Sequence, residues 1–153
     1  MISGIALDFG QTLVDSSAGF RKAEKKAQQD IGRDLAVTSY DGFLHMYREV
    51  RSNFHRARNF SRSSMWKEVY GLFGRDVAMD AVRKMELEYW ETVKRSTKPF
   101  GETNRVLAEL TDRYKLAVIS NTQGQLDQAG HRIAEFPELE RRFETIVIAG
   151  ESG

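Results

Sequence analysis

Three short runs of apolar residues recur along the chain, at residues 2–7, 115–120 and 145–149. Each run is bounded by polar residues and contains β-branched side chains, a pattern typical of parallel strands that are covered on both faces. Residues 102–114 have one apolar helical face, and residues 123–142 form a second helical segment, which Pro137 is expected to break. This repeated order of helix and strand predicts right-handed βαβ units in a parallel α/β sheet.

Residues 16–98 follow a helical period instead. Four apolar stripes recur at spacings of three and four, namely Phe20/Ala23/Ala27/Ile31, Phe43/Tyr47/Val50/Phe54/Ala57, Met65/Trp66/Val69/Tyr70/Phe73 and Ala78/Val82/Met85/Tyr89/Val93. Short polar turns are expected between them at residues 32–34, 59–64 and 74–76. Amphipathic helices joined in this way predict a helical bundle. We therefore expect two domains, an α/β core from residues 1–15 and 99–153 and a helical cap from residues 16–98.

Charge and composition narrow the possible partners. The 153 residues include 23 basic and 22 acidic side chains, so the chain has no general attraction for nucleic acid or for an anionic membrane surface. The absence of cysteine excludes disulfides, thiolate catalysis and sulfur-ligated metals. No stretch reads as a secretory signal or is long enough to span a bilayer. We expect a cytoplasmic protein with neither membranes nor nucleic acid as partners.

One carboxylate stands where the first predicted strand ends. Asp8 follows that strand directly and is followed by Gly10 and Thr12, while Ser120 and Asn121 end the second predicted strand. Open α/β sheets bind ligands at the carboxyl ends of their strands, so these side chains are expected to lie at one edge. An aspartate after a strand more often forms a turn than acts as a nucleophile. The dipeptide Ser-Asn is likewise common where a strand ends and a helix begins. Neither motif is specific by itself.

Taken in order, the two motifs resemble those of the haloacid dehalogenase-like (HAD) hydrolase superfamily. The sequence DFGQTL at residues 8–13 is similar to the first family motif, Asp-x-Asp-x-Thr-Leu, and VISN at residues 118–121 is similar to the second. The helical insertion between the motifs and the lead PFG at residues 99–101 match the helical-cap class. This resemblance covers nearly all of the chain. It implies a Rossmann-type parallel sheet with an inserted α-helical cap.

The resemblance also implies residue roles. Asp8 corresponds to the nucleophile, which attacks phosphorus in phosphatases and carbon in the dehalogenase branch. Thr12, Ser120 and Asn121 correspond to residues that orient the loop and bind phosphate. Magnesium is expected as the cofactor, held by Asp8 and by the main-chain carbonyl of Gly10. The implied substrate is a small phosphorylated metabolite.

Gly10 is the first departure from the family pattern. Family phosphatases carry a second aspartate there, which protonates the leaving oxygen, a role worth roughly 100-fold to 10,000-fold. The dehalogenase and phosphonatase branches lack that acid, so both remain alternatives. A non-catalytic HAD-fold interaction protein is a third.

The second departure concerns two further family motifs, a lysine and an acidic Gly-Asp motif, neither of which can be assigned within these 153 residues. We therefore expect this chain alone to be inactive, and we expect either that it is a fragment of a longer gene product or that a second chain completes its sheet. Without those elements the apolar strand at residues 2–7 would have an open edge, which invites self-association.

Two groups of basic side chains have no assigned chemistry. A stripe at helical spacing comprises Arg48, Arg51, His55, Arg58 and Arg62. It is compatible with a surface that selects anionic substrates or contacts nucleic acid, but a solvated helix face with balancing acids nearby is the more common meaning of such a stripe. His45 and His131 have no partner at metal-ligand or triad spacing, and no role is expected for either.

Overall fold

The computed structural model describes residues 2–121 and 131–149. The chain divides into two compact units, an α/β unit from residues 1–19 and 94–153 and a helical unit from residues 20–93. The divisions fall within the first and fourth helices, α1 (Ser17–Asp34) and α4 (Met79–Ser96). The helical unit is therefore one continuous insertion in the α/β unit.

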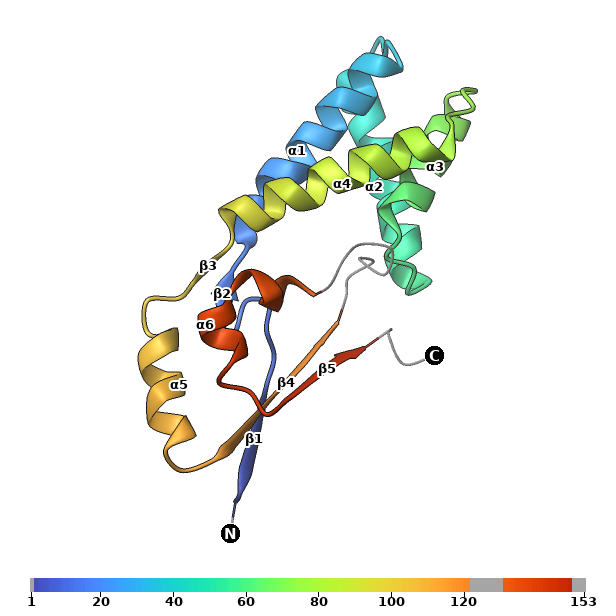
Figure 1. Ribbon diagram of the computed structural model, residues 1–153. Coiled ribbons are helices and arrows are strands. Elements are labelled where there is room, and N and C mark those ends of the chain that lie inside the picture. Colours follow the sequence, from blue (N-terminus) through green and yellow to red (C-terminus); the bar gives the residue numbers. More distant parts are fainter. Residues whose placement is uncertain (1, 122–130, 150–153) are drawn as a thin grey trace. The chain divides into compact units, whose positions relative to one another are not determined.

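The α/β unit is built on a parallel sheet of three strands, β1 (Gly4–Leu7), β4 (Lys115–Asn121) and β5 (Thr145–Ala149). The strand order is β1-β4-β5, and Figure 1 shows the three strands side by side. Leu7 pairs with Val118, and Ser120 pairs with Ile148. The predicted α/β class and parallel sheet are confirmed.

One face of this sheet is covered. Alternate residues of β4 are buried together with residues of α5 (Thr103–Thr111), a short 3₁₀ helix η1 (Arg132–Glu135) and α6 (Pro137–Glu140). The buried cluster comprises Phe9, Leu13, Val14, Leu107, Leu116, Val118, Ile133, Leu139 and Phe143. Pro137 lies in the first turn of α6 and separates it from η1, as predicted, because proline lacks the N–H that a continuous helix needs. The rest of the predicted segment, residues 122–130, lies outside the described residues.

The opposite face of the sheet is not covered by the part of the chain that the structure describes. Ile119 pairs with Val147, and these side chains are 53% and 45% exposed. Strand side chains alternate between faces, so both point away from the side that buries Val118. The expectation of strands covered on both faces is therefore wrong for the described residues.

A second, two-stranded ladder was not predicted. β2 (Val14–Asp15) pairs antiparallel with β3 (Lys98–Pro99), where the chain passes to the helical unit and where it returns. The Asp15 carboxylate accepts hydrogen bonds from the Ser17 N–H at 2.8 Å and from its hydroxyl at 2.5 Å. Asp15 thus caps α1, a role typical of a short acidic side chain before a helix.

The helical unit consists of α1 and α4 together with α2 (Tyr40–Arg56) and α3 (Arg62–Leu72). The predicted apolar stripes form its core, which comprises Ala23, Ala27, Ile31, Phe43, Tyr47, Val50, Met65, Trp66, Val69, Tyr70, Val82, Tyr89, Trp90 and Val93. Inside it, the Trp66 indole N–H donates to the Tyr47 hydroxyl oxygen at 2.8 Å. Among the described residues, no helix is long and apolar enough to cross a membrane.

The first predicted turn is misplaced. Residues 32–34 belong to α1, and the chain turns after them, at Ala36, whose φ is +49°. Gly32 serves a close approach instead, since a Cβ there would lie 3.2 Å from Cε2 of the Tyr40 ring. Glycine inside a helix therefore marks tight packing here rather than a helix end.

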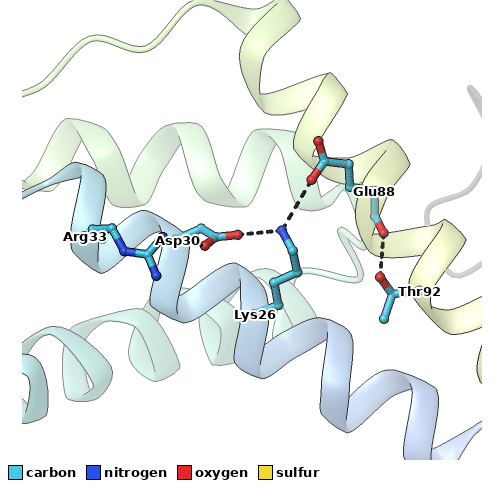
Figure 2. A network of polar contacts seen from close by, with 5 residues as sticks. All are labelled: Lys26, Asp30, Arg33, Glu88 and Thr92. Atoms are coloured by element: carbon cyan, nitrogen blue, oxygen red, sulfur yellow. Dashed lines mark hydrogen bonds and ion pairs between the residues drawn. The ribbon is translucent and has the colours of Figure 1, made fainter.

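Ion pairs join α1 to α4 on the surface of the helical unit. Figure 2 shows Lys26 Nζ between Asp30 Oδ2 at 2.6 Å and Glu88 Oε2 at 3.3 Å. The hydrogen bond that Lys26 donates to Asp30 is the main cause that raises the pKa of Lys26 above its usual value. Because all three groups are partly exposed, the network adds little stability.

The basic stripe is partly built into the helical unit. Arg51 Nη1 lies 3.2 Å from Glu24 Oε1. The Arg62 guanidinium carbon lies 4.2 Å from the ring centre of Tyr89 and 4.7 Å from that of Trp90. These two arginines therefore have structural partners, an acid for Arg51 and aromatic rings for Arg62.

Candidate active site

A tightly closed loop follows β1 and presents Asp8. The Phe9 carbonyl accepts the N–H groups of Leu13 at 2.9 Å and Val14 at 3.3 Å. Gln11 has a positive φ of +63°, which is uncommon for a residue other than glycine, and its N–H donates to the Val14 carbonyl at 2.9 Å. The Phe9 ring is fully buried, whereas Asp8 is exposed. The loop thus anchors itself through Phe9 and leaves the Asp8 carboxylate accessible.

Thr12 lies against that carboxylate. Its hydroxyl donates to Asp8 Oδ2 at 3.3 Å, so it can restrict the carboxylate's orientation. The amides of Gln11, Leu13 and Val14 donate within the loop. These three amides are therefore not available to an anion beside Asp8.

Ser120 and Asn121 lie at the same edge of the sheet as Asp8. They end β4, which neighbours β1, and the pairing of Leu7 with Val118 brings the carboxyl ends of these strands level. Ser120 is buried and Asn121 is exposed. Ser120 Oγ lies 2.9 Å from Nε2 of His131.

His131 is a site residue for which the sequence predicted no role. Only 6% of it is exposed, its ring contacts the Phe9 ring edge-on at 4.9 Å, and its Nδ1 accepts the Ile133 N–H at 3.2 Å. Burial, followed by the positive charge of Arg132, lowers the pKa of His131 to about 4, against the opposing effect of Asp8. Its place directly before η1 was the sole local sign of a structural role for His131. Its contact with Ser120 could not be seen locally, because Ser120 lies on another element.

Arg132 brings a buried positive charge close to the loop. It is 3% exposed, and its Nη1 donates to Ser16 Oγ at 2.8 Å. Its guanidinium carbon lies 5.7 Å from the centre of the Phe9 ring. Its Nη2 would lie 3.4 Å from a Cβ placed on Gly10.

The nearby Arg132 determines what a side chain at position 10 would meet. Among the described glycines, only Gly74 has a positive φ, so the backbone at Gly10 does not require glycine. A side chain would fit at ordinary contact distance, but it would face the Arg132 guanidinium. The position that corresponds to the second aspartate of the similar motif therefore lies beside a cation.

The loop around Asp8 offers only some of the ligands that a magnesium ion needs. Within residues 2–121 and 131–149, no group of three or more histidine, cysteine or acidic side chains lies together as a metal site. The predicted ligands, the Asp8 carboxylate and the Gly10 carbonyl, supply two oxygens, and Arg132 adds an opposing charge nearby. Since Mg²⁺ is often completed by water and substrate phosphate, these residues fit it only together with a bound phosphate.

The buried histidine predicts how stability depends on pH. The pKa of His131 is about 4 in the folded protein and 6.5 in the unfolded chain. Between these two pH values the unfolded chain therefore binds more protons than the folded protein. Stability is therefore lost as the pH falls from 6.5 to 4, by about 3 kcal/mol. Thermal unfolding followed by circular dichroism should show that His131→Gln flattens this dependence. The exposed His45→Gln is the matched control, and an unchanged slope in His131→Gln would contradict the assignment.

Comparison with known proteins identifies solved structures that share the fold of this chain. No protein-family model matches the chain, and no curated protein is significantly similar to it. Among solved structures, a magnesium-bound HAD hydrolase from Bacillus subtilis has a TM-score of 0.59 at 13% identity, with 96% of this chain and 65% of that chain covered. A 2-haloacid dehalogenase from Pseudomonas syringae has a TM-score of 0.58 at 18% identity, with coverage of 97% and 64%. A HAD phosphatase from Thermococcus onnurineus has a TM-score of 0.57 at 17% identity, with coverage of 96% and 62%.

The chain therefore has the HAD-like fold, as the resemblance of its motifs implies. It spans somewhat less than two thirds of the length of these three structures. The neighbours include both a phosphatase and a dehalogenase, so the fold does not select between the two reactions.

Proposed function

We propose that Asp8 is the nucleophile of a HAD-like hydrolase that removes the phosphoryl group from a small phosphorylated metabolite. The observation that carries the proposal is the exposed Asp8 carboxylate, which Thr12 contacts at the carboxyl edge where Ser120 also lies. In this proposal the helical unit is the cap. The proposal concerns the whole protein, because the chain spans less than two thirds of the length of these structural neighbours.

The reaction has two displacements at phosphorus. One Asp8 oxygen attacks the phosphorus, the ester oxygen leaves with the bonding electron pair, and an aspartyl phosphate forms. Water then attacks the same phosphorus, which releases phosphate and restores Asp8. In this proposal the Ser120 hydroxyl donates to a non-bridging oxygen of the phosphoryl group. Mg²⁺, held by Asp8, the Gly10 carbonyl and the phosphate, would offset negative charge on the transferring group.

A dehalogenase is the second candidate, and Gly10 favours it. Halide leaves without a proton, so a site with Arg132 in place of an acid suits such a leaving group. In that reaction Asp8 attacks carbon, and water then attacks the carboxyl carbon of the resulting ester.

A single turnover in H₂¹⁸O separates the two reactions. Phosphoryl transfer puts ¹⁸O into the released phosphate and leaves the tryptic peptide of residues 1–21 unlabelled. Dehalogenation puts ¹⁸O into Asp8 of that peptide. Mass spectrometry of the peptide and the phosphate after one turnover, with enzyme in excess, is the measurement. We expect labelled phosphate, and a heavier Asp8 would overturn the phosphatase proposal.

A non-catalytic interaction protein is the third candidate. Ile119 and Val147 form an exposed apolar pair, and β1 pairs with a single strand, β4, within the described sheet. An apolar face beside an open strand edge favours association with another chain. Sedimentation over a concentration series would support this function if association is strong, if Ile119→Thr with Val147→Thr weakens it, and if the intact protein turns over no phosphate ester.

A further inference from the structure

The hydrogen bonds around His131 select one tautomer of its ring. The Ile133 N–H points at Nδ1 at 3.2 Å, so Nδ1 must offer a lone pair. A neutral imidazole carries its single proton on the other nitrogen, which is Nε2. The Nε2–H therefore donates to Ser120 Oγ across the 2.9 Å contact.

This direction decides what the Ser120 hydroxyl can do. A hydroxyl has one proton to donate and two lone pairs to accept with. Because Ser120 accepts from His131, its own proton is not used in that contact. The opposite tautomer would consume the proton and leave Ser120 unable to donate to an anion.

We propose that His131 is a positioning residue, which holds Ser120 as a hydrogen-bond donor toward an anionic oxygen bound at the Asp8 edge. The anion's identity as a phosphoryl group rests on the proposed function, whereas the orientation of Ser120 does not. His131 also packs on Phe9, the residue after Asp8, so one side chain fixes both the nucleophile loop and Ser120.

The charge around the ring favours this arrangement. Burial and then the positive charge of Arg132 at the adjacent position disfavour the doubly protonated ring and lower the pKa of His131, whereas the negative charge of Asp8 favours that form. A doubly protonated ring would turn Nδ1 from an acceptor into a donor that opposes the Ile133 N–H. The acceptor at Nδ1 is thus maintained at neutral pH.

Nitrogen-15 NMR of the imidazole tests the orientation without reference to catalysis. We expect His131 to show a protonated Nε2 and an unprotonated Nδ1 at pH 7, and Ser120→Ala to speed exchange of the Nε2 proton by about 10-fold, as for loss of one hydrogen bond. A protonated Nδ1, or an exchange rate that Ser120→Ala leaves unchanged, would overturn the inference.

Vanadate inhibition of the intact protein tests the consequence. His131→Phe keeps an aromatic ring against Phe9 but removes the donor, and we expect it to weaken inhibition by about 10-fold to 100-fold. In a Ser120→Ala background the same change should cost little more, because both act on one hydrogen bond. His131→Gln, which retains an N–H donor, should recover part of the loss. His45→Phe is the matched control.

The outcomes separate this inference from the proposed function. Additive losses from His131→Phe and Ser120→Ala would overturn the positioning role even if turnover is present. If His131→Phe fails to fold, the Gln variant and the NMR tautomer still decide the orientation. If the intact protein neither binds vanadate nor turns over an ester, the proposed function fails while the NMR result stands on its own.

Discussion

Replacing Asp8 with asparagine is expected to lower turnover of an activated phosphate ester by at least about 1,000-fold, as for the loss of a catalytic nucleophile. The amide has nearly the same shape as the carboxylate but is a far weaker nucleophile. Since Asp8 is exposed and its contact with Thr12 needs only an acceptor oxygen, the variant should fold normally. Initial rates with p-nitrophenyl phosphate and magnesium, on the intact protein, measure the effect.

Asp112→Asn is the matched control for this change. Asp112 is an exposed aspartate at the end of α5 in the same unit, so its substitution should leave the rate unchanged. Turnover that survives in Asp8→Asn would refute the assigned mechanism.

Gly10→Asp is expected not to create a working general acid. The new carboxylate would lie beside the Arg132 guanidinium, whose Nη2 is 3.4 Å from the position of the added Cβ. A neighbouring positive charge lowers the pKa of a carboxyl group, so the acid would be ionised at neutral pH and have no proton to give. Rates with an alkyl phosphate should therefore stay within about threefold of the parent, well short of what general acid catalysis supplies.

Removing the cation should leave the negative charges of Asp8 and of a bound phosphate as the neighbours of the new carboxyl group, and like charges raise the pKa of a carboxyl group toward the range in which it can donate a proton. In an Arg132→Met background, Gly10→Asp should raise alkyl phosphate turnover by about 100-fold over Arg132→Met alone. Gly10→Asn in the same background supplies a similar side chain without an acid, and it should give no gain. A full gain from Gly10→Asp with Arg132 in place would show that the guanidinium does not control this position.

The hydrophobic pattern predicts most of the elements because it reports local burial. The helical stripes appear in α1 to α4, and the apolar runs appear as β1, β4 and β5. The exposed pair Ile119 and Val147 could not be foreseen, because a β-branched apolar run reads the same whether one face or both are covered. Likewise Gly32 reads as a turn residue, and its contact with Tyr40 depends on how α1 and α2 pack.

Only some residues of the candidate site could likewise be predicted from the sequence. Asp8, Thr12 and Ser120 can be found from sequence because each belongs to a local strand-end motif. His131 and Arg132 cannot be found in this way, because their roles depend on contacts with distant parts of the chain. His131 contacts Ser120, and Arg132 contacts Ser16 and lies beside Gly10. The reason for Gly10 likewise lies in a partner more than a hundred residues away in the chain.

Trapping the covalent intermediate tests the central claim most directly. Borohydride reduces an aspartyl phosphate to homoserine, so quenching the intact protein during turnover with tritiated borohydride should label the tryptic peptide of residues 1–21 at position 8. Asp15 in the same peptide is an internal control, because its carboxylate caps α1. Homoserine at position 8 is the predicted result, and turnover without label at that position would contradict the assignment of Asp8 as the nucleophile.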